Sequence, residues 1–166
     1  MFLPAVAALA AGAPFVAIAA YAAWRQARAP SAARVAAVLE GLRAMSWEQF
    51  SALIEGAYRR QGYEVAALKG PGADFELRKE GRLGLVSCKR WKVAQTGITP
   101  LRDLLEAKRA RDARECIYVA AGEFSANARE FAAKNGIRLL SGTELAQLLG
   151  PLADHFSTET PRQKAT

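Results

Sequence analysis

Apolar residues recur at helical spacing directly after Ser46, which predicts an amphipathic helix there. Ser46 and Gln49 have the spacing of a capping box, so the helix should begin after Ser46. Gly62 is placed to end it. The apolar face is made of Trp47, Phe50, Leu53, Ile54, Ala57 and Tyr58.

The next part of the chain has the composition of short strands, at residues 63–67, 74–79 and 83–90. Glu80-Gly81 separates the last two and is typical of a hairpin turn. A turn centred on this dipeptide sets Asp74 opposite Ser87. Lys89 lies two residues beyond Ser87, so strand alternation puts it on the same face, as it does Glu76.

Helices and short apolar strands alternate after the hairpin. Thr99 as the cap and Pro100 in the first turn predict a helix that runs to about Ala113. Strands are expected at 115–120 and 137–140, and helices at 125–134 and 143–149. The order αβββαβαβ(α) indicates an α/β fold with a mixed β-sheet flanked by helices, here assigned to residues 46–150. Residues 151–166 are polar without periodicity and are expected to form a flexible tail.

Residues 2–24 contain no charged side chain and are numerous enough to cross a bilayer as one helix. Arg25 and Arg28 follow at once, and no basic residue precedes the stretch. By the positive-inside rule this predicts a transmembrane helix at 1–24, single-pass in the inner (cytoplasmic) membrane, with the C-terminal domain in the cytoplasm. A cleaved signal peptide and a buried soluble helix are the alternatives. Residues 25–45, with a helix capped by Ser31, are interpreted as a basic juxtamembrane connector.

Composition narrows the function further. The chain of 166 residues has a net charge of +7 and is 51% apolar, which excludes a wholly disordered chain. Part of the positive charge lies at residues 25–43, where a membrane explains it. One His and two Cys argue against a zinc enzyme and a disulfide scaffold. Cys88 and Cys116 are expected to be small core residues.

The cluster of Asp74, Ser87 and Lys89 is the candidate site for metal binding and phosphate chemistry. A carboxylate beside backbone oxygens suits a hard cation such as Mg²⁺. A neighbouring lysine can orient a water or stabilise charge that develops on a phosphate. The alternative is an ordinary exposed face with an Asp–Lys pair.

Four fragments, in order, resemble the Mrr-type restriction endonuclease domain of the PD-(D/E)xK nuclease superfamily. They read SWEQFSALIEGAYRRQGYEV, DFELRKEGRLGLVSCKRWK, TGITPLRDLLEAK and FSANAREFAAKNGIRLLSGTELAQLL, within residues 46–149. The resemblance implies a restriction-endonuclease-like fold and a metal-dependent DNA endonuclease that restricts foreign DNA. It implies Mg²⁺ or Mn²⁺ as the cofactor, DNA as the partner, and no small-molecule cofactor.

The resemblance also implies roles for individual residues. Asp74, Lys89 and Ser87 take the catalytic positions. Metal ligands would be Asp74 and the backbone carbonyl of Cys88, with Glu76 or Glu55 as substitutes for a missing carboxylate. The residues expected to contact DNA are Arg90, Lys92, Arg102 and Lys108.

Two departures from the family pattern bear on activity. Ser87 stands where the family usually has Gln or Glu, and Ser51 follows Phe50 where Glu is usual. A catalytically degenerate DNA-binding or scaffold module at the membrane is therefore the alternative function. A small membrane protein whose soluble domain binds another protein is a third. The basic helix surface around Arg102 and Lys108 can equally be a solvated face, paired with Asp103, Glu106 and Asp112.

The apolar segment generates the first testable prediction. Because residues 2–24 are uncharged and long enough to span a bilayer, the full-length chain should sediment with membranes and be released only by detergent. Fractionation with salt, carbonate and detergent washes measures this. Recovery of full-length protein in the soluble fraction contradicts the anchor.

Overall fold

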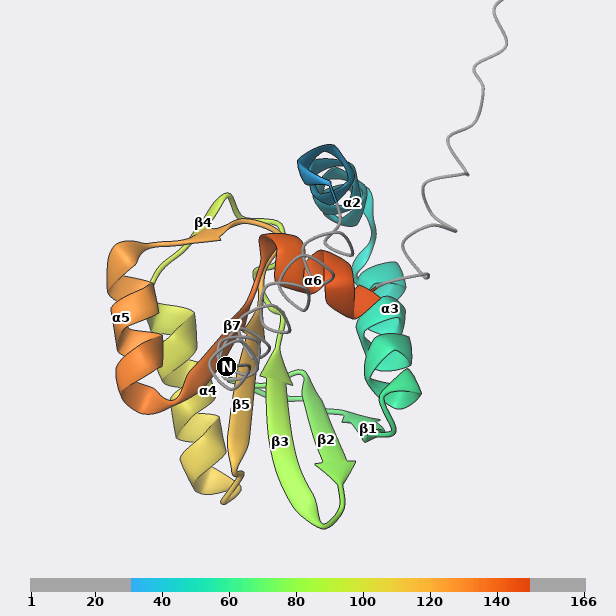
Figure 1. Ribbon diagram of the computed structural model, residues 1–166. Helices are drawn as coiled ribbons and strands as arrows, with labels where there is room; N and C mark the ends of the chain where they lie inside the picture. Colours follow the sequence, from blue (N-terminus) through green and yellow to red (C-terminus); the bar gives the residue numbers. More distant parts are fainter. Residues whose placement is uncertain (1–30, 150–166) are drawn as a thin grey trace, which may run out of the picture. The chain divides into compact units, whose positions relative to one another are not determined.

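The computed structural model describes residues 31–149 (Figure 1). The predicted transmembrane helix at 1–24, residues 25–30 of the connector and the predicted tail at 151–166 lie outside this range. Its helices are α2 (Ala32–Ala44), α3 (Trp47–Arg60), α4 (Thr99–Ala110), α5 (Ala126–Asn135) and α6 (Gly142–Leu149). Its strands are β1 (Glu64–Ala67), β2 (Phe75–Lys79), β3 (Arg82–Ser87), β4 (Gln95–Thr96), β5 (Glu115–Val119), β6 (Glu123–Phe124) and β7 (Ile137–Leu140).

The five-stranded sheet has the order β1-β2-β3-β5-β7. β1, β2 and β3 pair antiparallel, and β3, β5 and β7 pair parallel. The predicted mixed sheet flanked by helices is thus confirmed. A second sheet of β4 and β6 was not predicted, because two-residue strands leave no readable alternation in the sequence.

The β2–β3 hairpin has the predicted register. Phe75 pairs with Val86 at one end and Lys79 with Arg82 at the other. Glu80 and Gly81 have φ angles of 51° and 74°, as a type I′ turn requires at both central positions. The turn therefore sets which side chains of the two strands share a face.

Helices cover both faces of the sheet (Figure 1). On one face α2, α3 and α6 pack over Phe75, Leu77 and Val86. On the other, α4 and α5 pack over Leu85 and Tyr118. Since neighbouring strand residues alternate, Ser87 shares the face of Leu85 and looks toward α4.

Local signals set most helix ends. The capping box between Ser46 and Gln49 is present, and Ser125 caps α5 through the Ala128 N–H. The predicted Thr99 cap is wrong. Ile98 is the cap residue of α4, its backbone is already helical and it makes no side-chain cap, although Pro100 does lie in the first turn.

Helix α2 packs against the core of the domain, whereas the sequence predicts a connector there and a domain that begins at residue 46. Val38 and Leu42 are buried in the core that α6 shares. The Arg43 guanidinium donates to the Ala121 carbonyl at 2.8 Å, and the Trp91 indole donates to the Leu42 carbonyl at 3.3 Å. These contacts join α2 to loops far along the sequence, which local pattern cannot reveal.

The described helices were compared with the length and apolarity of a membrane span. Between residues 31 and 149, none combines the length and apolarity that crossing a bilayer requires.

The loop between β1 and β2 lies directly against α4, and Gly72 makes the approach possible. Its φ is +88°, and a Cβ there would come within 2.5 Å of the Asp103 carbonyl oxygen and 2.8 Å of the Ala107 Cβ. Gly72→Ala should therefore lower the free energy of unfolding by about 2 kcal/mol or more.

Gly97→Ala is the matched control, because nothing lies within 4 Å of a Cβ at Gly97 and its φ is not positive. Urea denaturation of both variants measures the difference. Equal stability of the two would show that the contact between the loop and α4 is not tight.

Candidate active site

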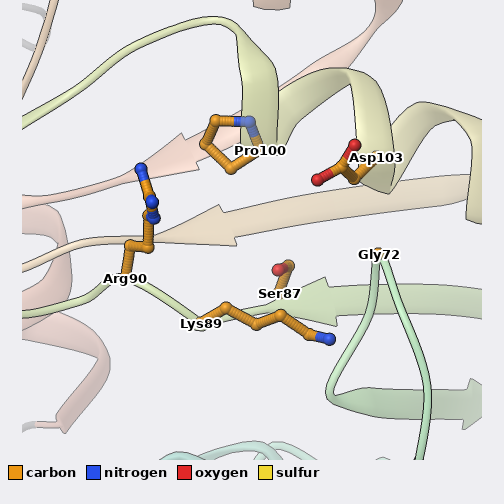
Figure 2. Close-up of a pocket in the computed structure, with 6 residues that line it drawn as sticks. All are labelled: Gly72, Ser87, Lys89, Arg90, Pro100 and Asp103. Atoms are coloured by element: carbon orange, nitrogen blue, oxygen red, sulfur yellow. The ribbon is translucent and has the colours of Figure 1, made fainter.

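A small pocket of about 100 Å³ lies where the end of β3, the loop before β2 and the start of α4 meet (Figure 2). The sheet, the loop and the helix each contribute to its wall. The lining residues are Gly72, Ser87, Lys89, Arg90, Pro100 and Asp103.

Asp74 is fixed at the end of the hairpin beside this pocket. Its N–H donates to the Val86 carbonyl at 2.8 Å, and its own carbonyl accepts the Leu68 N–H at 2.8 Å. Its Oδ2 accepts the Cys88 N–H at 2.6 Å. The carboxylate therefore bridges the two strands beyond the last residue pair of the ladder.

The surroundings of Asp74 act on the pKa of its carboxyl in opposite directions. Half-burial raises the pKa of its carboxyl above the usual 3.8, and this desolvation is the largest effect. The Cys88 N–H, the Lys89 ammonium and the Ser87 hydroxyl each act to lower the pKa. Asp74, Ser87 and Lys89 are thus close enough to interact, as the hairpin register predicts for the first two.

Lys89 reaches the site by a different route from the one predicted. β3 ends at Ser87, and the Trp91 N–H donates to the Cys88 carbonyl at 3.1 Å in a turn. Strand alternation therefore does not extend to Lys89. Its ammonium donates to the Gly70 carbonyl, and its side chain runs back along β3 toward the loop with Gly72 (Figure 2).

The cysteines are core residues, as expected. Cys88 is fully buried among the side chains of the opposite face, and its carbonyl, the predicted metal ligand, already accepts the Trp91 N–H. Burial raises the pKa of both thiols, so Cys88 and Cys116 stay neutral.

The two carboxylates predicted as substitute metal ligands, Glu76 and Glu55, form ion pairs with arginines. Glu76 shares the sheet face of Asp74 but forms ion pairs with Arg78 at 2.7 Å and Arg111 at 3.3 Å. Glu55 pairs with Arg59 at 2.5 Å on α3, the helix that covers the opposite face. The structure thus gives neither a place in the pocket.

The four predicted DNA-contacting residues have different surroundings. Arg90 lines the pocket. The Lys92 ammonium lies over the Trp91 ring at 5.3 Å, and the Arg102 guanidinium lies over the Phe131 ring at 6.0 Å. Lys108 is near Cys116, whose pKa it acts to lower. Only Arg90 accompanies Lys89.

Asp103 is the pocket residue whose role the sequence did not indicate. It projects from the second turn of α4 toward the side where Ser87 and Lys89 lie (Figure 2). From its sequence, Asp103 is expected to pair with the basic residues of its own helix. Yet among residues 31–149 no side chain forms an ion pair or hydrogen bond with its carboxylate. The contact that brings α4 to the loop at Gly72 is non-local, so no sequence pattern announces it.

The polar atoms at this place fit a hard divalent cation. Asp74, Ser87 and Asp103 offer oxygen, and no thiol or imidazole accompanies them. Within the described ranges no three His, Cys, Asp or Glu side chains gather as a metal centre. Mg²⁺ commonly takes one or two carboxylates and completes its shell with water and substrate phosphate, so the set is sufficient.

Comparisons with known proteins bear on the same region. The family model Mrr_cat, described as "Restriction endonuclease", matches residues 42–149. The solved "Protein of Unknown Function AF1548" is 14% identical with a TM-score of 0.45, over 63% of this chain and 58% of that one. The "DNA modification-dependent restriction endonuclease AspBHI" is 14% identical with a TM-score of 0.49, over 76% of this chain and 36% of that one. No curated protein matches the chain.

The buried charge of Asp74 generates a stability prediction. The raised pKa means that ionisation penalises the folded state; the penalty is present above the folded-state pKa and disappears as the pH falls below 3.8. Asp74→Asn removes the charge and keeps an acceptor for the Cys88 N–H, so its Tm in EDTA should exceed that of the wild type at pH 7. The gap should narrow toward pH 4.

Asp74→Ala is the comparison, because it leaves the buried Cys88 N–H without an acceptor and should melt below Asp74→Asn at every pH. Thermal melts followed by circular dichroism supply both measurements. A pH-independent gap between Asp74→Asn and the wild type would show that desolvation of Asp74 is not the dominant effect.

Proposed function

The chain belongs to the Mrr_cat restriction endonuclease family, and we propose that its described domain is a metal-dependent DNA endonuclease acting at the pocket beside β3. The observation that carries the proposal is the meeting of Asp74, Ser87 and Lys89 at the end of one hairpin. Family membership makes DNA the expected substrate. Anchoring through residues 2–24 stays a prediction, because these residues lie outside the described range.

Each residue has a distinct part in phosphodiester hydrolysis under this proposal. Asp74 keeps Oδ1 for a cation while Oδ2 is held by the Cys88 N–H. The Ser87 hydroxyl, 2% exposed, adds a neutral oxygen. A bound Mg²⁺ or Mn²⁺ supplies charge compensation at the phosphate and acidifies a water. The Lys89 ammonium stabilises charge that develops on the phosphate oxygens.

The pocket rim attracts phosphate by two further means. Lys89 and Arg90 bring two positive charges to one side. Pro100, in the first turn of α4, places the positive end of that helix dipole at the other side. A backbone phosphate seated between them faces cationic groups on both flanks, which favours DNA over a neutral ligand.

A DNA-binding module without cleavage is the second candidate, and Ser87 is the observation that favours it. A serine hydroxyl adds no charge where the family usually has Gln or Glu, so metal affinity can fall below what turnover needs. Binding by Lys89, Arg90 and the α4 N-terminus does not require the cation. A gel shift in EDTA, paired with absence of nicking, identifies this function.

A supercoiled-plasmid nicking assay tests the endonuclease proposal. Nicking by the wild type should be slow, and Mn²⁺ should outperform Mg²⁺ because it binds such ligands more tightly. Lys89→Ala should lower the rate about 100-fold or more, and Asp74→Ala should abolish nicking. Ser87→Glu should raise metal affinity and increase the rate.

Lys134→Ala is the matched control for Lys89→Ala, because its ammonium pairs with Glu130 on α5 at 2.7 Å and does not line the pocket. It should keep a rate close to that of the wild type. Absence of nicking in either metal, with no rescue by Ser87→Glu, rules out the endonuclease and leaves the binding module.

A further inference from the structure

We propose that Asp103 on α4 is the second anionic ligand of the divalent cation and takes over the charge that Ser87 cannot supply. This inference rests on the proposed function and deepens it. It predicts a metal site whose ligands come from both the hairpin and α4. The sequence resemblance instead indicates ligands from the hairpin, with Glu55 as a possible replacement for the missing carboxylate.

The position of Asp103 carries the proposal. Its carboxylate lines the pocket with Ser87 and Lys89 and is directed to their side (Figure 2). Asp74 follows two residues after Gly72, whose backbone touches α4 at Asp103 itself. The close approach of loop and helix therefore brings Asp103 to the loop that leads into Asp74.

Asp103 is also free to bind a cation. The glutamates considered earlier are neutralised by arginines, whereas in the part of the chain that the structure describes no ion pair or hydrogen bond engages the Asp103 side chain. A carboxylate directed into a pocket beside two cations, with no partner of its own, is available to a ligand.

One of the buried hydroxyls without a hydrogen-bond partner, that of Tyr118, lies next to the pocket; those of Tyr58 and Thr96 lie elsewhere in the described structure. Tyr118 pairs with Ser87 across β3 and β5, is 0% exposed, and its hydroxyl has no hydrogen-bond partner in the described structure. The Arg90 N–H lies near it without hydrogen-bond geometry, and the charge of Asp74 acts on it. Buried hydroxyls are nearly always satisfied, and a water bound to a cation held by Asp74 and Asp103 would donate a hydrogen bond to the Tyr118 hydroxyl oxygen.

A second carboxylate would raise the affinity of the site for a divalent cation. Asp74 alone gives the cation one formal negative charge, and one of its oxygens is already used by the Cys88 N–H. A second carboxylate doubles the charge and completes a ligand set of the kind that Mg²⁺ uses with substrate phosphates. Asp103 projects from a rigid helix, so its approach costs little reorganisation.

Direct Mn²⁺ titration of the purified full-length chain, by calorimetry and by the loss of the free-ion spin-resonance signal, tests the assignment without any activity measurement. Asp103→Asn should weaken Mn²⁺ affinity about tenfold or more. Asp112→Asn removes the same charge beyond the other end of α4, where Asp112 is exposed, and should stay within about twofold of the wild type.

Rescue makes the test specific. Ser87→Glu in the Asp103→Asn background returns a carboxylate to the pocket and should recover Mn²⁺ affinity. Asp103→Ser, with circular dichroism as the folding check, substitutes if Asp103→Asn is poorly folded. A merely structural role of Asp103 would not be rescued by a change at Ser87.

The outcomes separate this inference from the proposed function. Wild-type affinity in Asp103→Asn, with loss in Asp74→Asn, overturns the role of Asp103 and leaves the endonuclease intact. Tighter Mn²⁺ binding or faster nicking in Asp103→Asn also overturns it, since the carboxylate would then only repel phosphate. No Mn²⁺ binding by wild type, with a gel shift retained in EDTA, overturns the endonuclease itself.

Discussion

The hydrogen bond from the Cys88 N–H to the Asp74 carboxylate, 2.6 Å long, is the interaction on which the site depends. It forms after the last residue pair of the β2–β3 ladder and, with the hydrogen bond from the Asp74 N–H to the Val86 carbonyl, joins the two strand ends. On one side it fixes a half-buried carboxylate, and on the other it sets where the chain turns toward Lys89.

A second constraint brings the helix to the hairpin. The backbone at Gly72 approaches α4 so closely that a Cβ would collide with the Asp103 carbonyl. The loop and the helix therefore pack tightly against one another at the wall of the pocket. The same contact makes α4 more than a cover for the sheet, since its first turns supply a positive helix end and a free carboxylate beside Lys89 and Arg90.

Features encoded locally were predictable from the sequence. The Glu80-Gly81 turn fixed the hairpin register, and with it the proximity of Asp74 and Ser87, because turn geometry decides which residues pair. Capping at Ser46 and Ser125 is equally local. Lys89 was placed in the right neighbourhood for a wrong reason, since β3 stops at Ser87 and a turn continues the chain.

What escaped prediction depends on contacts between distant segments. In the sequence, Asp103 is one of several acidic residues on a basic helix. Its place in the pocket follows from the contact between α4 and the loop at Gly72. The burial of Leu42 in α2 depends on Trp91 and α6, which lie far along the chain. No periodicity within a segment reports such contacts, so both required the fold.

The serine at position 87 has a physical consequence beyond a missing ligand. Ser87 is 2% exposed and its hydroxyl interacts with Asp74, whose pKa desolvation already raises. A glutamate there would set two like charges in a poorly solvated place, each raising the pKa of the other until a cation arrived. Ser87 instead stabilises the ionised form of Asp74 through a hydrogen bond. Asp103 is exposed on α4, so its carboxylate is in contact with solvent. Distributing the two carboxylates between a buried strand end and an exposed helix thus reduces the electrostatic penalty of the metal-free site, while the pocket between them remains suited to a cation.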